Sequence, residues 1–243
     1  MIKIVVPISG GKDSQLCLQL ALSQHQPDGV MGLFCDTQFE HPKTYAHVEF
    51  IARHYGVRIE RRTGGSVPEK VRKHKRFPAS HIRFCTDELK IRVSRDFYKE
   101  LVETNGPFEV WYGMRTAESG MRARRYAGKI SSDLYAPHEF MPSKYPKLLA
   151  KAGVMFRLPI IDFSEKQVLM ELNGLENPLY REGFDRVGCF PCLASGDKWK
   201  DKAFNHDEFG RKQRTIVIQL ERDIGKSVWT SKAYGPGCAM CSY

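Results

Sequence analysis

Several features are missing from this 243-residue sequence, and each absence excludes a class of protein. No apolar run approaches the ~20 residues that a helix needs to cross a bilayer, which argues against a membrane protein. The first residues lead directly into a strand-like pattern, without the basic segment, long apolar segment or small-residue cleavage site of a leader peptide. Internal repeats and low-complexity tracts are also lacking. We therefore expect a soluble, cytoplasmic protein.

Acidic residues are too few to balance the basic ones. The chain has 28 Asp and Glu against 38 Lys and Arg, which gives a net charge of +10. A positive charge of this size favours a polyanionic partner, because a Lys or Arg placed against a phosphate releases counterions. A nucleic acid is one candidate, and a nucleotide with several phosphates is another. The hydrophobic content of 42% excludes a disordered chain and suits one domain with an appended module.

The seven cysteines are an odd number, and a chain of this length needs no disulfide staples. Metal binding or catalysis is therefore the better expectation for them. Two pairs have the C-x-x-C spacing, Cys189 with Cys192 and Cys238 with Cys241. Two residues between thiolates let both sulfurs reach one metal ion or cluster. Spacing alone favours a four-cysteine zinc site, and redox disulfides without metal are a further alternative.

Apolar runs alternate with helical patterns in the first half of the chain. The predicted strands lie at residues 2–8, 30–35, 57–60 and 108–112, and the predicted helices follow residue 14 and span 44–55 and 88–102. This alternation predicts an α/β fold, a doubly wound parallel sheet with helices on both faces. Ligands of such sheets bind at the carboxyl ends of the strands, so we expect the loops that follow the strands to form the site.

The second half is less regular. Residues 128–156 contain three prolines and little periodicity, which predicts a long loop with short elements. Beyond it we expect a helix at 165–172, a turn-rich region that bears cysteines, and a final helix at about 207–224. The predicted boundary divides a nucleotide-binding domain, 1–172, from a small C-terminal cysteine-bearing module, 173–243.

The loop after the first strand carries the clearest chemical signal, the sequence Ser-Gly-Gly-Lys-Asp-Ser. Its two glycines lack the Cβ atoms that would keep backbone N–H groups away from phosphate oxygens, and the helix that follows adds its positive dipole end. The order is not that of the Walker loop, which has four residues between its glycines. The predicted nucleotide contacts in this loop are Ser9, Gly10, Gly11, Lys12, Asp13 and Ser14.

With this loop the chain resembles the PP-loop ATP pyrophosphatases, whose Ser-Gly-Gly-x-Asp-Ser motif grips the pyrophosphate of ATP while a substrate oxygen attacks the α-phosphate. Two later stretches are similar to the phosphoadenosine phosphosulfate reductase-like branch of that superfamily. One looks like its Asp-Thr-Gly-x-Glu-x-Pro segment, with Gln38 in place of glycine, and implies that Asp36 and Thr37 contact the adenosine. The other looks like its Gly-x-Arg-x-x-Glu-Ser motif and places Gly113 and Arg115 at the nucleotide, where a guanidinium binds phosphate oxygens bidentately.

The resemblance also implies a set of cysteine ligands that differs from the zinc alternative. The stretch from Cys85 looks like the family's Cys-Thr-x-x-Leu-Lys motif, whose cysteine joins a Gly-Cys-x-x-Cys pair in holding a [4Fe–4S] cluster. The implied ligands are Cys85, Cys189 and Cys192. The fourth must come from elsewhere, and either Cys238 or Cys241 of the tail can supply it; we assign Cys238. Cys241 is then free for sulfur transfer, and Zn²⁺ stays the alternative metal.

These motifs together predict an enzyme. The family's sulfonucleotide reductases carry a modified loop and a Glu-Cys-Gly-x-His tail, whereas this chain has the intact loop and ends in Gly-Cys-Ala-Met-Cys-Ser-Tyr. The chain more closely resembles sulfurtransferases that thiolate tRNA or the DNA backbone. We expect pyrophosphate-releasing adenylation of a nucleic acid for sulfur transfer, with ATP, Mg²⁺ and the cluster. The predicted catalytic residues are Lys12, Asp13, Arg115 and Cys241.

Two alternative functions stay open: reduction of phosphoadenosine or adenosine phosphosulfate, and a non-catalytic module that binds a nucleotide and zinc. Basic runs at residues 70–76 and 122–125 are candidates to face phosphates. The Asn-Pro-Leu-Tyr turn at 177–180, which also resembles the family, is interpreted as structural. The sequence names no sulfur donor, and a homodimer is one option for the oligomeric state.

Overall fold

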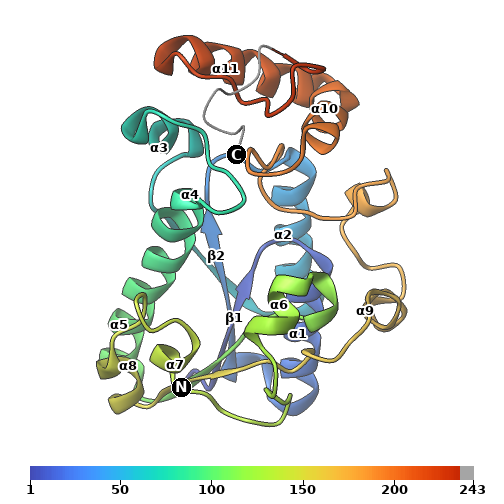
Figure 1. Ribbon diagram of the computed structural model, residues 1–243. Helices are drawn as coiled ribbons and strands as arrows, with labels where there is room; N and C mark the ends of the chain where they lie inside the picture. Colours follow the sequence, from blue (N-terminus) through green and yellow to red (C-terminus); the bar gives the residue numbers. More distant parts are fainter. Residues whose placement is uncertain (236–243) are drawn as a thin grey trace. The chain divides into compact units, whose positions relative to one another are not determined.

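The computed structural model describes residues 1–235 of the chain (Figure 1). Two compact units are present. The first comprises Met1–Cys35, Pro42–Arg62 and Arg92–Val187, and the second comprises Asp36–His41, Thr63–Ile91 and the chain from Gly188 onward. This division differs from the predicted boundary at residue 173, because two segments from the first half of the sequence pack with the C-terminal helices.

A five-stranded sheet in the order β3-β2-β1-β4-β5 forms the centre of the first unit. The strands are β1 (Ile4–Ile8), β2 (Val30–Asp36), β3 (Arg58–Thr63), β4 (Phe108–Trp111) and β5 (Val154–Arg157). β1 pairs in parallel with both β2 and β4, and β4 pairs in parallel with β5. The direction of strand succession reverses between β1 and β4, and a ligand site is expected at the carboxyl ends of the strands that flank such a switch point.

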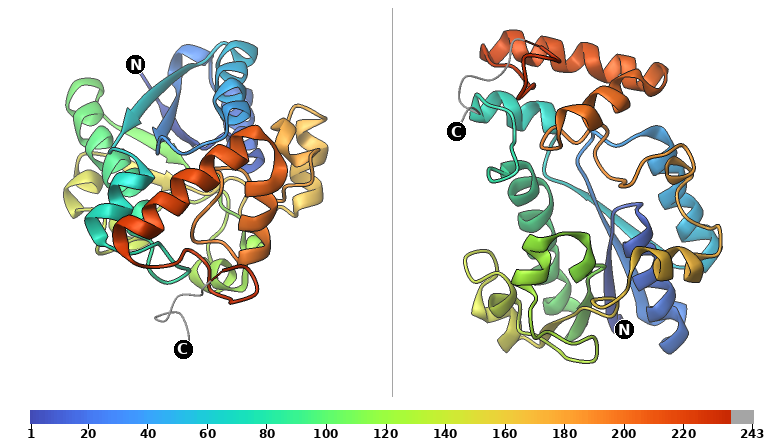
Figure 2. Two further views of the ribbon diagram at one scale, coloured as in Figure 1. Left: turned by 90° about the horizontal axis from the view of Figure 1, so that it is seen from above. Right: turned by 45° about the vertical axis from the view of Figure 1, so that its right-hand side comes forward.

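Helices cover both faces of this sheet (Figures 1 and 2). α1 (Lys12–Gln24), α2 (Pro42–Tyr55) and α9 (Glu165–Leu172) pack on one face, where their apolar side chains join those of β1 in a single core. α5 (Arg92–Asn105) covers the other face, where Tyr98 contacts the rings of Phe108 and Phe156. The predicted α/β fold, a parallel sheet with helices on both faces, is thus confirmed.

Residues 128–156 contain the short helices α7 (Pro137–Phe140) and α8 (Lys147–Lys151), as predicted. The other short elements of the first unit are η1 (Pro27–Gly29), η3 (Thr116–Glu118), α6 (Gly120–Arg125) and η4 (Pro178–Tyr180). The sequence interpretation missed β5, because four residues are too few to show a period. α9 begins as its sequence indicates, with the Ser164 hydroxyl accepting from the backbone N–H of Gln167 at 3.2 Å.

The second unit is helical. It contains α3 (Val67–His74), α4 (Phe84–Thr86), the π-helix η2 (Asp87–Ile91), α10 (Asp197–His206) and α11 (Glu208–Ile224). α11 packs against both α3 and α10. Both views of Figure 2 show α10 and α11 joined at an angle. Its core gathers apolar side chains from three parts of the sequence, among them Phe39, Val71 and Leu220. These contacts explain why residues 36–41 and 63–91 belong with the C-terminal helices.

An ion pair buried in the second unit fixes the segment that follows α11. Lys200 is 1% exposed, and its ammonium lies 2.8 Å from Asp197 Oδ1 and also donates to the carbonyl of Val228. Asp197 accepts from the backbone N–H and hydroxyl of Thr230 and from the N–H of Ser231. α10 was not predicted from the sequence. Charged side chains occupy positions on the buried face of this helix, where apolar residues would have indicated a helix.

No helix in the described part of the chain is both long and apolar enough to cross a membrane.

We predict that Asp197→Asn destabilises the protein by about 3–5 kcal/mol, because an isosteric amide leaves the Lys200 ammonium buried without its charge partner. Urea unfolding followed by circular dichroism measures the effect. Asp201→Asn on the same helix is the matched control, since Asp201 is partly exposed and its carboxylate accepts from the neighbouring Asn205. Equal stability of the two variants would contradict this role for Asp197.

Candidate functional site

The loop between β1 and α1 is held in shape by its own hydroxyl groups. Ser14 Oγ donates to the carbonyl of Gly11 at 2.9 Å and accepts from the backbone N–H of Ser9 at 3.2 Å. Ser9 Oγ in turn accepts from the N–H of Gly11 at 3.3 Å. The two serines therefore fold the loop back on itself at the start of α1, where the orphan N–H groups of a helix and its dipole favour an anion.

A second set of contacts holds this loop against α2 and against the Asn-Pro-Leu-Tyr turn. Gly10 has φ +74°, and a Cβ there would lie 2.6 Å from Thr44 Cγ2 on α2, so the position requires glycine. The carbonyl of Gly10 accepts from Nδ2 of the fully buried Asn177 at 3.1 Å. Asn177 begins the Asn-Pro-Leu-Tyr turn, which therefore contacts the loop directly.

The loop after β4 makes a very close approach to the first loop. A Cβ on Gly113 would lie 2.6 Å from the carbonyl oxygen of Asp13 and 2.8 Å from the backbone nitrogen of Ser14. Only a glycine allows backbone to pack on backbone at this separation. The structure thus brings together the two sequence-predicted segments at the carboxyl ends of β1 and β4, on either side of the switch point.

Arg115 lies in the second loop and is 4% exposed. Its Nε donates to Asp13 Oδ1 at 2.6 Å, and its Nη1 donates to the carbonyl of Phe163 at 3.4 Å. Arg115 therefore fixes the orientation of the Asp13 carboxylate. Glu118 supports this loop by accepting from the Arg115 backbone N–H at 3.3 Å and pairing with Arg122.

The Lys12 side chain is 4% exposed and surrounded by oxygen atoms. Its ammonium lies 2.9 Å from Glu165 Oε1 and 3.2 Å from the carbonyl oxygen of Asp185. The Glu165 side chain is 55% exposed at the first position of α9, so this partner can move away at little cost. The predicted loop lysine is thus present at the site, with a replaceable carboxylate as its partner.

Tyr180 contacts the candidate site, although the sequence interpretation treated its turn as structural. Its hydroxyl accepts from the backbone N–H of Lys12 at 3.1 Å, and the Lys12 ammonium lies 4.4 Å from the centre of its ring. Burial raises the pKa of this phenol, which keeps it protonated at neutral pH. The hydroxyl proton has no acceptor among residues 1–235. The motif resemblance gave the signal, but only the fold places this hydroxyl at the loop.

The predicted adenosine contacts Asp36 and Thr37 lie in the second unit and are almost fully buried. Asp36 Oδ1 accepts from the Gln38 backbone N–H at 2.8 Å, and Thr37 Oγ1 donates to Glu40 Oε1 at 2.7 Å. Gln38, which replaces the family's glycine, adopts a positive φ of 54°. Both side chains thus stabilise their own turn, and their contact with a nucleotide stays a prediction.

This turn contacts Cys189. Residues Glu40 and Cys189 form an isolated antiparallel bridge, and the Cys189 thiol lies 3.2 Å from the Thr37 hydroxyl and 3.9 Å from Glu40 Oε1. Burial raises the pKa of Cys189 to about 12, with the Glu40 carboxylate adding to the shift. Without a metal this sulfur is therefore a protonated thiol.

Two further predicted ligands, Cys85 and Cys192, lie in the same unit as Cys189. Burial raises the pKa of Cys85, and a charge on Cys192 raises it further, as it does for Cys189. Three thiols in one neighbourhood fit the donor chemistry of zinc or an iron–sulfur cluster. However, no three His, Cys, Asp or Glu side chains within residues 1–235 are arranged to hold a metal ion. Cys238 and Cys241 lie outside the described residues.

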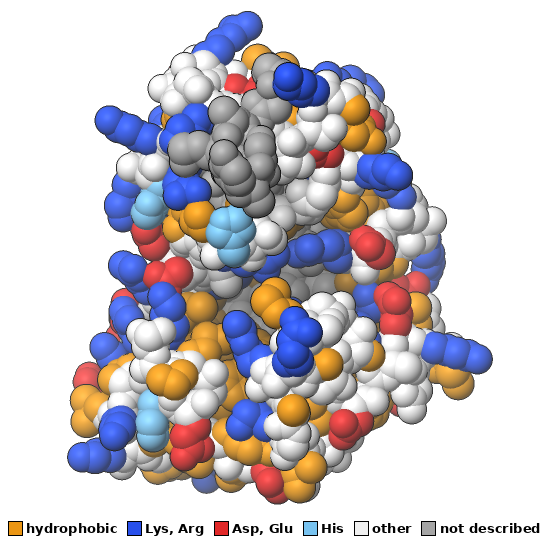
Figure 3. Space-filling view, viewed as in Figure 1, with side chains coloured by type: hydrophobic (Ala, Val, Ile, Leu, Met, Phe, Trp, Pro, Cys, Tyr) orange, Lys and Arg blue, Asp and Glu red, His pale blue; other side chains and the backbone are white. Residues whose placement is uncertain are grey.

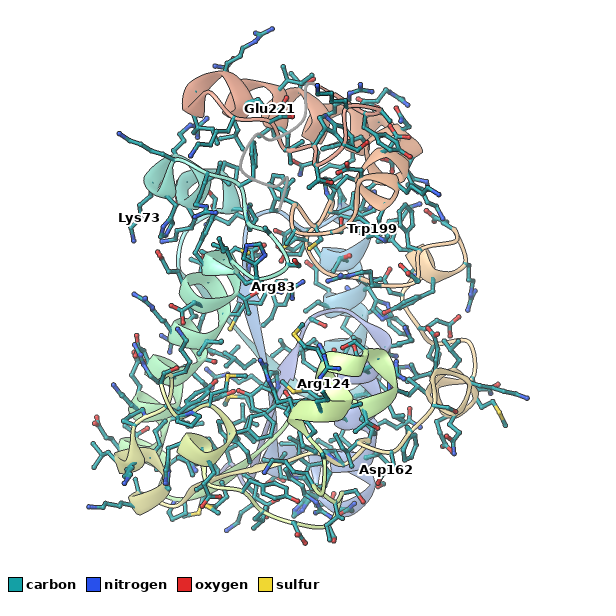
Figure 4. All side chains as sticks on the ribbon, viewed as in Figure 1. Lys73, Arg83, Arg124, Asp162, Trp199 and Glu221 are labelled. Atoms are coloured by element: carbon teal, nitrogen blue, oxygen red, sulfur yellow. The ribbon has the colours of Figure 1, made fainter. Side chains whose placement is uncertain are left out.

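Four basic residues of the run at 70–76 pair with carboxylates within the second unit. Lys73 and His74 contact the two oxygens of the buried Glu88 at 2.8 and 2.6 Å, and Lys70 lies 3.5 Å from it. The hydrogen bond from Lys73 helps to hold the pKa of Glu88 at about 2. Arg72 pairs with Asp223 on α11 at 2.8 Å. Most of this run therefore joins α3 to its neighbours. The run at residues 122–125 lies on α6, which Arg124 marks in Figure 4.

The family of the chain follows from its sequence match. A family model, the phosphoadenosine phosphosulfate reductase domain, matches residues 3–195, and the chain belongs to this family. It is 32% identical over 194 residues to an uncharacterised protein of Methanocaldococcus jannaschii, covering 79% of this chain and 36% of that protein. It is also 26% identical over 239 residues to an uncharacterised 37.8 kDa protein of Escherichia phage 186, covering 78% of this chain and 66% of that protein. The chain thus spans only part of both relatives.

A solved structure supports the same assignment at the level of the fold. The phosphoadenylyl-sulfate reductase of Candida auris, in a phosphate complex, has a TM-score of 0.50 at 19% identity, over 79% of this chain and 83% of that one. The predicted membership of the PP-loop superfamily, in its phosphoadenosine phosphosulfate reductase-like branch, is therefore confirmed.

We predict that Gly113→Ala lowers stability by about 1–3 kcal/mol, because the added methyl group forces the backbone of Asp13 and Ser14 to move. Hydrogen exchange at residues 9–15 should also become faster. Gly120→Ala is the matched control, since a Cβ there meets no atom within 4 Å. Wild-type exchange in the Gly113 variant would show that the two loops do not pack as described.

Proposed function

We propose that the protein is an ATP-dependent enzyme that adenylates an acceptor, a nucleic acid, and releases pyrophosphate, so that sulfur can then be transferred to the activated position. The observation that carries this proposal is the intact Ser-Gly-Gly-Lys-Asp-Ser loop, folded at the start of α1 and backed by Gly113. Such a loop suits the pyrophosphate part of ATP because it combines backbone donors, a helix N-terminus and a buried lysine.

In the proposed reaction an acceptor oxygen forms a bond to the α-phosphorus of ATP. The bond from this phosphorus to the bridging oxygen breaks, pyrophosphate leaves with the electron pair, and the acceptor proton passes to solvent. Negative charge therefore develops on the leaving pyrophosphate. Lys12 and the loop N–H groups are placed to stabilise that charge, with a phosphate oxygen replacing Glu165 at the ammonium.

Tyr180 and Asp13 have distinct proposed roles at the same loop. The Tyr180 hydroxyl accepts from Lys12 and still has a proton to donate, so it can pass a hydrogen bond from the loop to a phosphate oxygen. Arg115 holds Oδ1 of Asp13, which directs the carboxylate and makes its other oxygen the candidate contact for the Mg²⁺ that accompanies ATP. Arg115 is thus proposed as a positioning residue.

Cys85, Cys189 and Cys192 are the proposed protein ligands of a [4Fe–4S] cluster, with Cys238 as the fourth. A bound cluster would supply iron sites that bind sulfur. Cys241 is proposed to deliver sulfur, taken from an external sulfur donor, to the adenylated position, where the bond to sulfur forms as the bond to the AMP oxygen breaks and AMP leaves. Thr37 donates to Glu40 and contacts Cys189, and these contacts orient the Cys189 side chain.

Reduction of a sulfonucleotide is the second candidate, and the family match to the reductase domain favours it. A single assay series separates the two. Protein purified without oxygen is incubated with a dithiol reductant, which supplies the two electrons that sulfite formation needs, and with either Mg²⁺-ATP plus tRNA or DNA, or phosphoadenosine phosphosulfate; pyrophosphate and sulfite are both measured. The proposal expects pyrophosphate only when a nucleic acid is present. Sulfite production from the sulfonucleotide without ATP would establish the reductase instead.

We predict that Lys12→Ala weakens Mg²⁺-ATP binding about 10- to 100-fold, the effect of losing a charged hydrogen-bond donor. Tyr180→Phe should weaken it less, by about 3- to 10-fold, because one neutral donor is lost. Isothermal titration calorimetry measures both. Lys166→Ala, an exposed lysine on α9, is the control and should bind ATP as the wild type does. Unchanged affinity in the Lys12 variant would rule out this nucleotide site.

We also predict that Cys85→Ala loses its iron when purified without oxygen, whereas the wild type contains a brown iron–sulfur chromophore. Metal analysis and absorption spectra provide the measurement. Cys17→Ala is the control, because Cys17 is fully buried in the core of the first unit. If the Cys85 variant instead retains stoichiometric zinc and the wild type contains no iron, the two C-x-x-C pairs hold the metal and the cluster proposal is wrong.

A further inference from the structure

The carboxylates of α11 all have partners within the second unit. Glu208 pairs with Lys212 at 2.7 Å, and Asp223 accepts from Arg72 at 2.8 Å. Glu221 accepts from the Ser227 hydroxyl at 2.9 Å and from the Val228 backbone N–H at 2.8 Å. These three acidic side chains therefore serve the protein's own structure. Glu221 marks the helix in Figure 4.

The arginines of α11, unlike its carboxylates, have few partners within the described part of the second unit. Arg211, Arg214 and Arg222 are exposed, and none forms a salt bridge with any residue in the part of the chain that the structure describes. The only hydrogen bond of these guanidiniums within residues 1–235 joins Arg214 to Asn205 Oδ1 at 3.4 Å. Three guanidinium groups thus keep most of their donors for another molecule.

These arginines also share one face of the helix. At 100° per residue, positions 211, 218 and 222 lie on the side opposite the buried residues Gln213, Val217 and Leu220, and position 214 lies at the edge of that side. From Arg211 to Arg222 the helix advances by eleven residue steps, about 16 Å along the axis. Ile218, 39% exposed, stands within it and offers an apolar surface between the charges. We define these four residues, Arg211, Arg214, Ile218 and Arg222, as the arginine row.

The row is one place in the second unit where basic side chains lack an acidic partner among the described residues, and exposed lysines such as Lys75 and Lys198 are others. On α3, by contrast, Lys70, Lys73 and His74 surround Glu88, and Arg72 is paired with Asp223. The upper part of Figure 3, which shows the side of the second unit seen in Figure 1, has more blue Lys and Arg side chains than red Asp and Glu.

We propose that the arginine row is the surface on which the phosphate backbone of the nucleic-acid acceptor docks. This inference rests on the proposed function, and it names the surface that the function leaves open. Guanidinium groups match phosphate oxygens bidentately, a row of them along a helix can follow successive phosphates of one strand, and Ile218 can contact the sugars between them. The docking is electrostatic and independent of base sequence.

The test measures binding of fluorescent tRNA and duplex DNA by anisotropy over a series of salt concentrations, with the cluster-loaded full chain. The variant is R211Q/R214Q/R222Q, and the matched control is K3Q/K147Q/K151Q, which removes the same charge from exposed lysines of the first unit. We expect at least tenfold weaker binding in the arginine variant. The slope of log K against log salt should fall by about 2–3, since each phosphate contact contributes ~0.7–0.9. The control should keep the wild-type slope, and R211K/R214K/R222K should keep most of it.

A slope that stays at the wild-type value in the arginine variant, or that falls equally in the control, would overturn the docking surface while the nucleic-acid acceptor stands. A larger loss in K73Q/K75Q/R76Q than in the arginine variant would do the same and would move the surface to α3. If the wild type binds Mg²⁺-ATP but neither nucleic acid, the proposed acceptor is wrong, and the proposal that the arginine row is its docking surface is wrong as well. Calorimetric ATP affinity and thermal melting of each variant exclude misfolding as the cause.

Discussion

The close approach of two loops at the centre of the sheet is the constraint on which the candidate site depends. Because β1 and β4 are neighbours and run in parallel, the segments that follow them leave the sheet at the same edge. Gly113 then packs against the backbone of Asp13 and Ser14, and Arg115 reaches Asp13 from the same segment. The start of α1 is thereby held in one orientation from the sheet side, while Asn177 and Thr44 hold Gly10. A loop fixed from both sides can present its N–H groups without reorganisation when charge develops on a ligand.

Electrostatic pairing explains which charged residues serve structure and which are open to ligands. Lys12 has an exposed, exchangeable carboxylate as its partner, whereas Lys200 has the buried Asp197 and a backbone carbonyl. Both lysines are buried, but only the first can give up its acidic partner to another anion at small cost, since exposed ion pairs contribute about 1 kcal/mol or less. The same distinction separates α3, whose basic residues surround Glu88, from the arginine row of α11.

The sequence predicted those features that depend on local pattern. Strand and helix alternation gave the α/β sheet, and the adjacent glycines before Lys12 placed the loop at the end of β1. It could not predict α10, whose buried side includes Asp197 and Lys200, or the second unit, which joins residues 36–41 and 63–91 to the C-terminal helices through contacts far apart in sequence. Tyr180 illustrates the same limit within the site. Its turn was identified from the motif, but its contact with Lys12 spans 168 positions, and only the fold creates it.

Hydrogen exchange in the presence of Mg²⁺-ATP or pyrophosphate tests the central claim most directly. If the loop between β1 and α1 binds the pyrophosphate group, slower exchange should appear in peptides that cover residues 9–15, because their backbone N–H groups would then donate to phosphate oxygens. The peptide that covers residues 113–118 should also be protected, since this segment packs against Asp13. Wild-type protein that exchanges at the same rate in these peptides with and without saturating nucleotide would contradict the account, as would protection confined to other parts of the chain.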